Sequence, residues 1–239
     1  MSSRVTQKEE AHRARLAAEA AAARDRRGRI LRKYVICVVG LGVIALGALF
    51  VISHGGTSGP PAAKSGKPGA YAYAVGDPGP GAPAPPLRLA STTGNTFDLA
   101  AEKGETVLLY FQEGVGCQPC WDQIKDLERD PSQLAALGID EMVSISGNDL
   151  GQLRQKVADE GIKTPLLADP DLRVSKTYQA NQHGMMGSSA DGHSFLVVGP
   201  DGRVIHRADY GGAPDYTMYV PVKDLVADLR AGIRAARSR

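Results

Sequence analysis

Cysteine is scarce in this chain, with three residues in 239, and two of them form its sole C-x-x-C pair, Cys117 and Cys120, in "EGVGCQPCWDQI". There is no second C-x-x-C pair and no H-x-x-x-H pair, which argues against a structural zinc site, because such a site takes four Cys or His ligands. A static disulfide across this short step would close too small a loop to stabilise the fold much. Dithiol chemistry is the interpretation that these absences favour. The third cysteine, Cys37, lies in an apolar run and is interpreted as a small apolar filler.

The body of the chain also lacks an excess of positive charge. Residues 1–33 carry ten Lys/Arg against four acids, a net +6, so the chain's total of +2 leaves −4 for the remainder. A mildly acidic body argues against a nucleic-acid partner. The basic segment itself is rich in Ala, Glu and Arg and is predicted to be a cytoplasmic helix.

Residues 34–52, "YVICVVGLGVIALGALFVI", contain no charged side chain. As a helix they would extend roughly 28 Å, close to the hydrocarbon thickness of a bilayer. Basic residues crowd the N-terminal flank, so the N-terminus is predicted to be cytoplasmic and the C-terminal part extracytoplasmic. A cleavable signal peptide is disfavoured, because the apolar run is long and no A-x-A-like site follows closely. We therefore expect a single-pass protein of the cell membrane.

Residues 53–86 are dominated by Gly, Pro and Ala and are predicted to form a tether, since they bury little apolar surface. Residues 87–239 then form one domain, long enough for a good core. Hydrophobic periodicity and turn residues predict an α/β domain with a mixed sheet. The expected elements are a strand at 106–111, a helix at 120–130, a strand at 141–146, a helix at 148–161 begun by an Asn148 cap, a short strand and helix over 164–179, a hairpin at 193–210 and a terminal helix at 222–236.

The cysteine pair falls where the expected strand at 106–111 meets the following helix. Unpaired N–H groups of a helix's first turn, and its dipole, favour an anion at Cys117 and lower a thiol's pKa. Cys120, one turn further, is positioned to attack a mixed disulfide and release the partner. Pro119 is tolerated in a first turn and stiffens the small ring. This placement predicts a redox-active dithiol that needs no organic cofactor and no metal.

Strand–"GVGCQPCW"–helix, with "HSFLVVGPDGRVIHR" downstream as a hairpin, resembles the thioredoxin fold. More narrowly, it resembles the redoxin/thiol-specific-antioxidant branch and the membrane-tethered TlpA/ResA-type proteins, over roughly residues 86–232. The resemblance implies that Cys117 attacks and Cys120 resolves. It also implies a thiol–disulfide oxidoreductase acting on protein thiols or disulfides outside the membrane, more as a reductant than as an oxidant, with a membrane electron donor as a further partner.

Two alternatives stay open. Sco-type copper proteins pair two cysteines with a histidine just before the same hairpin strand, and here His193 stands there, with His183, Met185 and Met186 nearby as further soft or imidazole ligands. A peroxide reductase of the peroxiredoxin kind is the other, although the residues before Cys117 lack the Pro and Thr of the P-x-x-x-T-x-x-C signature.

Two smaller features accompany the cysteine pair. Glu113 is either a buried acid that moves protons for the dithiol or an exposed loop acid. Trp121 is expected to pack at the rim of the site.

Overall fold

The structure, a computed structural model, describes residues 70–238. The expected basic segment (1–33), the expected membrane helix (34–52) and the first half of the expected tether (53–69) lie outside this range, as does residue 239. Among the helices of residues 70–238, none has the length and apolar character needed to span a bilayer.

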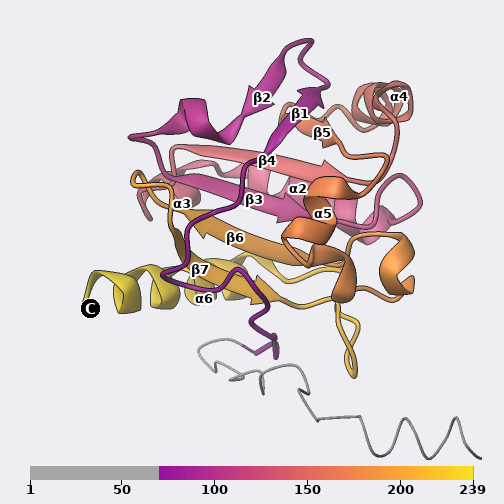
Figure 1. Ribbon diagram of the computed structural model, residues 1–239. Coiled ribbons are helices and arrows are strands. Elements are labelled where there is room, and N and C mark those ends of the chain that lie inside the picture. The colour runs from indigo at the N-terminus through magenta and orange to yellow at the C-terminus, as the bar shows by residue number, and fades with distance from the viewer. Residues whose placement is uncertain (1–69, 239) are drawn as a thin grey trace, which may run out of the picture. The chain divides into compact units, whose positions relative to one another are not determined.

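Seven strands form one mixed sheet in the order β2-β1-β5-β4-β3-β6-β7 (Figure 1). Three central strands, β3, β4 and β5, run parallel, whereas β6 and β7 continue the sheet antiparallel on one side and the β1–β2 hairpin does so on the other. The strands are β1 (Arg88–Ser91), β2 (Thr96–Asp98), β3 (Val107–Phe111), β4 (Glu141–Ser146), β5 (Leu166–Ala168), β6 (Ser194–Val198) and β7 (Val204–Asp209). The predicted mixed α/β sheet is confirmed.

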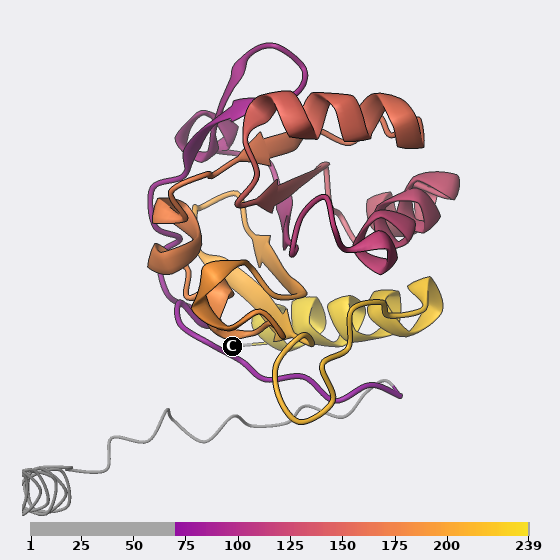
Figure 2. The same ribbon diagram turned by 90° about the vertical axis from the view of Figure 1, so that its right-hand side faces the viewer.

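Helices cover both faces of the sheet (Figure 2). In that view α2, α4 and α6 lie on one face and α5 lies on the other. The helices are α2 (Gln118–Arg129), α3 (Ser132–Ala135), α4 (Leu150–Glu160), α5 (Arg173–Thr177) and α6 (Val222–Arg237), with short 3-10 turns η1 (Leu99–Glu102), η2 (Ala180–Gln182) and η3 (Gly187–Ser189).

The central strand β3 is buried on both faces, which explains its unbroken apolar sequence "VLLYF". Successive side chains alternate between the faces. Leu108 and Tyr110 join the core cluster under α2 and α6, and Leu109 and Phe111 join the cluster on the α5 side. Because β3 leads directly into the turn before α2, this rigid strand positions the cysteine pair.

Residues 70–86, which we name the strap, differ from the prediction of a tether that reaches residue 86. The strap forms two bridges, one from Ala74 to Asp209 of β7 and one from Pro83 to Arg203, the residue just before β7. Tyr73 is buried, with its ring edge-on to those of His206 and Tyr210 at centroid distances of 5.9 and 5.3 Å. Composition suggested a free chain because the few apolar side chains were diluted by Gly, Pro and Ala. The strap is nevertheless held by Tyr73, by the strand edge, and by side-chain hydrogen bonds of Arg203, Arg207 and Asp209.

Candidate redox site

The cysteine pair lies at the start of α2. Cys117 is the N-cap residue, Pro119 lies in the first turn, and Cys120 follows at the third helical position. The two cysteines form a disulfide with a Cα–Cα distance of 5.4 Å. The helix therefore begins at Gln118, two residues before the predicted start, and the N–H groups of Cys120 and Trp121 donate to the Cys117 carbonyl at 3.0 and 3.4 Å.

The two sulfurs differ in access. Cys117 retains 8% of its surface, between the exposed residues Gly116 and Gln118, whereas Cys120 retains 0%. Cys117 is therefore the more exposed of the two cysteines. This asymmetry suits a pair in which the outer sulfur exchanges with a partner and the inner one closes the disulfide.

The segment that delivers Cys117, residues 112–117, is named the cysteine loop. Its backbone is held by neutral side chains: Gln112 Oε1 accepts from Gly114 N–H at 2.7 Å, and Asn148 Oδ1 accepts from Val115 N–H at 3.0 Å. Trp121 Nε1 donates to the Gly114 carbonyl at 3.0 Å. The loop is therefore fixed by groups that keep their charge state at any physiological pH.

Two sequence predictions about these side chains are wrong. Asn148 is not the cap of α4, because Asp149 takes that place and accepts from Gln152 N–H at 2.9 Å, which frees Asn148 to hold the cysteine loop. Trp121 does not lie at the rim; it is fully buried, and the Lys156 ammonium stands 5.6 Å from its ring centroid. The indole points inward because its N–H has a backbone partner in the loop.

Facing the cysteine loop is a second segment, residues 183–191, named the methionine loop. Glu113 connects the two, since its Oε1 accepts from Met185 N–H at 3.0 Å. Burial raises the pKa of Glu113, and its hydrogen bonds from the Met185 and Met186 backbone lower it by less. Glu113 is thus half-buried, which lies between the buried acid and the exposed loop acid that the sequence left open. Met185 and Met186 are 54% and 59% exposed.

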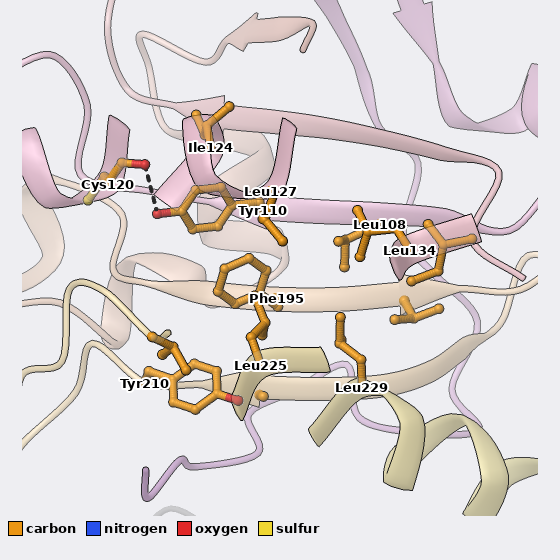
Figure 3. Close-up of a cluster of buried hydrophobic side chains, with 14 of the residues drawn as sticks. Leu108, Tyr110, Cys120, Ile124, Leu127, Leu134, Phe195, Tyr210, Leu225 and Leu229 are labelled. Carbon is orange, nitrogen blue, oxygen red and sulfur yellow. Dashed lines mark hydrogen bonds between the residues drawn. The ribbon is translucent and has the colours of Figure 1, made fainter. Parts of the chain in front are cut away.

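His193 follows the methionine loop and is completely buried. Its Nδ1 lies 2.8 Å from the Tyr110 hydroxyl, which in turn donates to the Cys120 carbonyl at 3.5 Å. Burial lowers the pKa of His193 to about 3, so the imidazole is neutral. Figure 3 shows Tyr110 between Cys120 and Phe195, with its hydroxyl directed at the Cys120 carbonyl.

The copper alternative gains no support from this geometry. Within residues 70–238, no three or more His, Cys, Asp or Glu side chains are grouped so that they could hold a metal ion. His193 is engaged with Tyr110, and His183 Nε2 is 3.7 Å from Asp209 Oδ2. The residues predicted as a ligand set are thus divided among different partners.

Sequence reasoning missed Tyr110, Gln112 and Asn148 as members of the site. Two of them carried a usable signal, because a hydroxyl and an amide in or directly after a buried strand need hydrogen-bond partners. Asn148 carried none, since its neighbour Asp149 has the same capping chemistry.

A mixed sheet between two layers of helices, with a disulfide-forming C-x-x-C pair at the start of a helix that follows the central strand, defines a redox protein of the thioredoxin-like class. The chain belongs to the AhpC/TSA family, whose model matches residues 80–207, and is therefore a redox-active thiol oxidoreductase. The match begins inside the strap and ends within β7.

Relatives and solved structures agree with this class. Two Mycobacterium tuberculosis proteins, from strains CDC 1551 / Oshkosh and ATCC 25618 / H37Rv and both named as candidate peroxiredoxins, are 30% identical to this chain over 129 residues, which are 53% of this chain and 82% of theirs. The crystal structure of the peroxidoxin BcpB from Mycobacterium tuberculosis superposes with a TM-score of 0.53 at 17% identity, over 64% of this chain and 97% of that one. The crystal structure of the reduced 2-Cys peroxiredoxin of Plasmodium vivax superposes with a TM-score of 0.54 at 19% identity, over 66% of this chain and 83% of that one. At these identities the solved structures support the fold.

Proposed function

We propose that this chain is a membrane-anchored, extracytoplasmic thiol–disulfide oxidoreductase that reduces disulfides of partner proteins through Cys117 and Cys120. The observation that supports it most is the disulfide between Cys117, the N-cap residue of α2, which keeps 8% of its surface exposed, and the fully buried Cys120. The predicted span at residues 34–52 and its basic N-terminal flank support the location.

The exchange proceeds in two balanced steps. In the reduced protein, the Cys117 thiolate attacks one sulfur of the partner's disulfide, which forms a mixed disulfide and releases the partner's other sulfur as a thiolate that takes up a proton. Cys120 then loses its proton and attacks Cys117 Sγ, which releases the second partner thiol and forms the disulfide seen here. Two electrons pass to the partner, and a dithiol donor, for which a membrane protein is the candidate, must restore them.

The test compares three full-length proteins: wild type, Cys117→Ser and Cys120→Ser. Cys117→Ser should lose insulin disulfide reduction by on the order of 10³-fold or more, because the attacking sulfur is gone. Cys120→Ser should accumulate mixed disulfides that a reducing gel resolves. Wild-type rates in both variants would refute the proposal.

Peroxide reduction is the second candidate, and the family match and the two relatives named as peroxiredoxins favour it. Here the Cys117 thiolate would attack one peroxide oxygen, the O–O bond would break, and the other oxygen would leave as water or an alcohol, which makes Cys117 a sulfenic acid. The Cys120 thiol would then attack Cys117 Sγ and release the sulfenic hydroxyl as water, forming the same disulfide. Cys117 is not preceded by the Pro and Thr of the peroxiredoxin signature, which is why this candidate stands second. Hydrogen peroxide consumption with dithiothreitol as the reductant separates the two functions: consumption that outpaces insulin reduction and disappears in Cys117→Ser would reverse their order.

A further inference from the structure

The exposed apolar side chains of the domain are few and lie in two loops. Among residues 70–238, the large apolar side chains that remain exposed are Met185, Met186 and Tyr216, at 54%, 59% and 45%. The two methionines belong to the methionine loop, and Tyr216 belongs to residues 211–217, which we name the tyrosine loop. Single exposed apolar side chains are common on proteins, whereas a group of them in adjoining loops indicates a contact surface.

The two loops do adjoin. The Gly211 N–H donates to the His193 carbonyl at 3.3 Å, and a Cβ on Gly211 would clash with the His183 carbonyl oxygen. His183 stands two residues before Met185, and the Tyr216 N–H donates back to the Gly212 carbonyl at 2.9 Å. The backbones that carry the exposed side chains are therefore packed against each other.

Strand pairing places both loops at the same end of the sheet as the cysteine pair. Phe111 of β3 pairs with Ser194 of β6, and Ser194 pairs with Asp209 of β7. The cysteine loop begins directly after Phe111, the methionine loop ends shortly before Ser194, and the tyrosine loop begins shortly after Asp209. This end of the sheet is on the right in Figure 1 and faces the viewer in Figure 2. We name it the redox end.

The strap enters the domain at the redox end. Its two bridges, at Ala74 and Pro83, are antiparallel, so the strap runs opposite to β7. Ala74 bridges to Asp209, the last residue of β7, and the ring of the preceding Tyr73 lies 5.3 Å from that of Tyr210. Followed toward the N-terminus, the chain therefore passes beyond the end of β7, on the side where the methionine and tyrosine loops lie.

The chain that precedes the strap is short in comparison with the domain. Residues 53–69 separate the predicted span at 34–52 from the strap. As the predicted tether, they would cover roughly 20–25 Å between their ends. A domain of this size is about 40 Å across. An anchor at 34–52 would therefore hold the redox end, where the tether attaches, nearer to the bilayer than the opposite end.

The composition of the two loops indicates which part of a bilayer they would contact. Residues 183–191 and 211–217 contain no Lys or Arg, and Asp215 beside Tyr216 is exposed. Attraction to anionic headgroups depends on basic residues, so it is not the source of binding here. Tyrosine is enriched at the boundary between headgroups and acyl chains, and methionine adapts to irregular apolar surroundings. Burial of apolar surface is the contribution that these loops offer.

We propose that Met185, Met186 and Tyr216 form a lipid-contacting surface, so that the redox end of the domain rests on the membrane. This inference rests on the proposed function, from which it takes the anchor. It specifies the direction from which partners arrive. Glu113 links the cysteine loop to Met185, so a donor or substrate held in the membrane meets Cys117 at the side that touches the lipid.

The experiment uses the full-length protein in phosphatidylcholine vesicles whose acyl chains carry bromine, which quenches indole fluorescence on contact. Trp121 is the chain's sole tryptophan and is fully buried, so it gives a constant background. Tyr216→Trp places an indole in the proposed surface. Lys103→Trp is the matched control, because Lys103 is exposed and precedes β3, at the opposite end of the sheet. We expect at least about threefold stronger quenching in Tyr216→Trp.

A second pair of substitutions tests the methionines in the Tyr216→Trp protein. Met185→Gln with Met186→Gln replaces two apolar side chains by polar ones of similar length and keeps the backbone N–H that Glu113 accepts. Less apolar surface is then buried in lipid, and the equilibrium should shift about tenfold away from lipid contact, seen as a loss of quenching. Unchanged quenching would remove the methionines from the proposed surface. Met186→Trp is a second probe if Tyr216→Trp does not fold.

The outcomes separate this inference from the proposed function. Equal quenching in Tyr216→Trp and Lys103→Trp, in a protein that floats with the vesicles and reduces insulin, refutes the inference and leaves the proposed function intact. Indole emission that shifts with protein density, and not with brominated lipid, identifies a second copy as the occupant and also overturns the inference. A protein that does not float with the vesicles refutes the anchor and the inference together.

Discussion

The two loops that approach each other beside Cys117 are held by opposite kinds of chemistry. The cysteine loop (112–117) is fixed by the amides of Gln112 and Asn148 and by the indole of Trp121, none of which titrates. The methionine loop (183–191) is held by the Asn181 amide, which donates to the Ser188 carbonyl at 3.2 Å, and in addition by two carboxyl groups whose pKa values burial raises.

Those carboxyl groups are Glu113 and Asp191. Burial raises the pKa of Asp191 to about 8, and nearby Asp169 adds to the shift. The Ser175 hydroxyl lies 2.9 Å from Asp191 Oδ2 and 2.7 Å from Asp169 Oδ2. One hydroxyl hydrogen cannot serve two carboxylates, so a protonated Asp191 completes the bridge. The comparison teaches that the backbone beside Cys117 is held by side chains that do not titrate, whereas the contact between the two loops, through Glu113, and the far end of the methionine loop, through Asp191, depend on protons.

Gln112→Glu breaks the comparison most strongly, because it gives the cysteine loop a titratable anchor. Gln112 is fully buried, so the pKa of the new carboxyl should be raised. The folded chain then keeps a proton on this carboxyl at pH values where the unfolded chain has lost it. The free energy of unfolding therefore falls as the pH rises from the usual glutamate pKa to the raised one. We expect a loss of about 3 kcal/mol at pH 8 and little loss at pH 4, measured by urea unfolding. Equal losses at both pH values would contradict this account.

Gly114→Ala tests the fixed geometry of the same loop. Gly114 has φ +102°, and a Cβ there would stand 1.9 Å from Asn148 Oδ1. The strained backbone and the contact together should cost about 2–3 kcal/mol and slow disulfide exchange. Gly187→Ala in the methionine loop is the matched control, since its φ is +60° and nothing lies within 4 Å, so about 1 kcal/mol is expected. Similar losses in the two variants would show that the cysteine loop is no more rigid than the other.

Asp191→Asn should remove a proton dependence from the methionine loop, with the smallest effect of the three. The folded pKa of about 8 exceeds the ordinary aspartate value of 3.8, so wild-type stability declines as pH rises between these values and is level above them. The asparagine variant lacks this decline. Its stability relative to wild type should therefore grow by more than about 1 kcal/mol between pH 4 and pH 8 in urea unfolding. Parallel pH profiles would mean that Asp191 is ionised in the folded protein.

What sequence patterns predicted well was local and periodic. The continuous apolar run of β3, the hairpin around "GPDG" and the amphipathic face of α6 each indicate their own element, and the family resemblance ordered them into the correct fold. The β1–β2 hairpin was missed because its strands have four and three residues, too few for a periodicity to appear.

The sequence predicted only those parts of the site that lie close together along the chain. Cys117 and Cys120 are three apart, so the helix alone sets their geometry. Asn148, Met185 and His193 reach the site through the packing of β4 and β6 beside β3, a long-range arrangement that no local pattern encodes. The sequence predicted Asn148 as a helix cap and Met185 and His193 as possible copper ligands. Each prediction used the hydrogen-bonding or ligand chemistry of the side chain, but the structure gives these residues other neighbours.

The strap changes how far the catalytic domain can travel from an anchor. A fully extended chain covers at most about 3.5 Å per residue, so residues 53–86 would allow an excursion of about 120 Å, whereas residues 53–69 allow about 60 Å. Because the strap is hydrogen-bonded to β7 and to the turn before it, half of the residues expected to form a free tether belong to the domain. If the predicted helix at 34–52 is embedded in a bilayer, the protein serves only substrates that come within that shorter radius of the membrane surface.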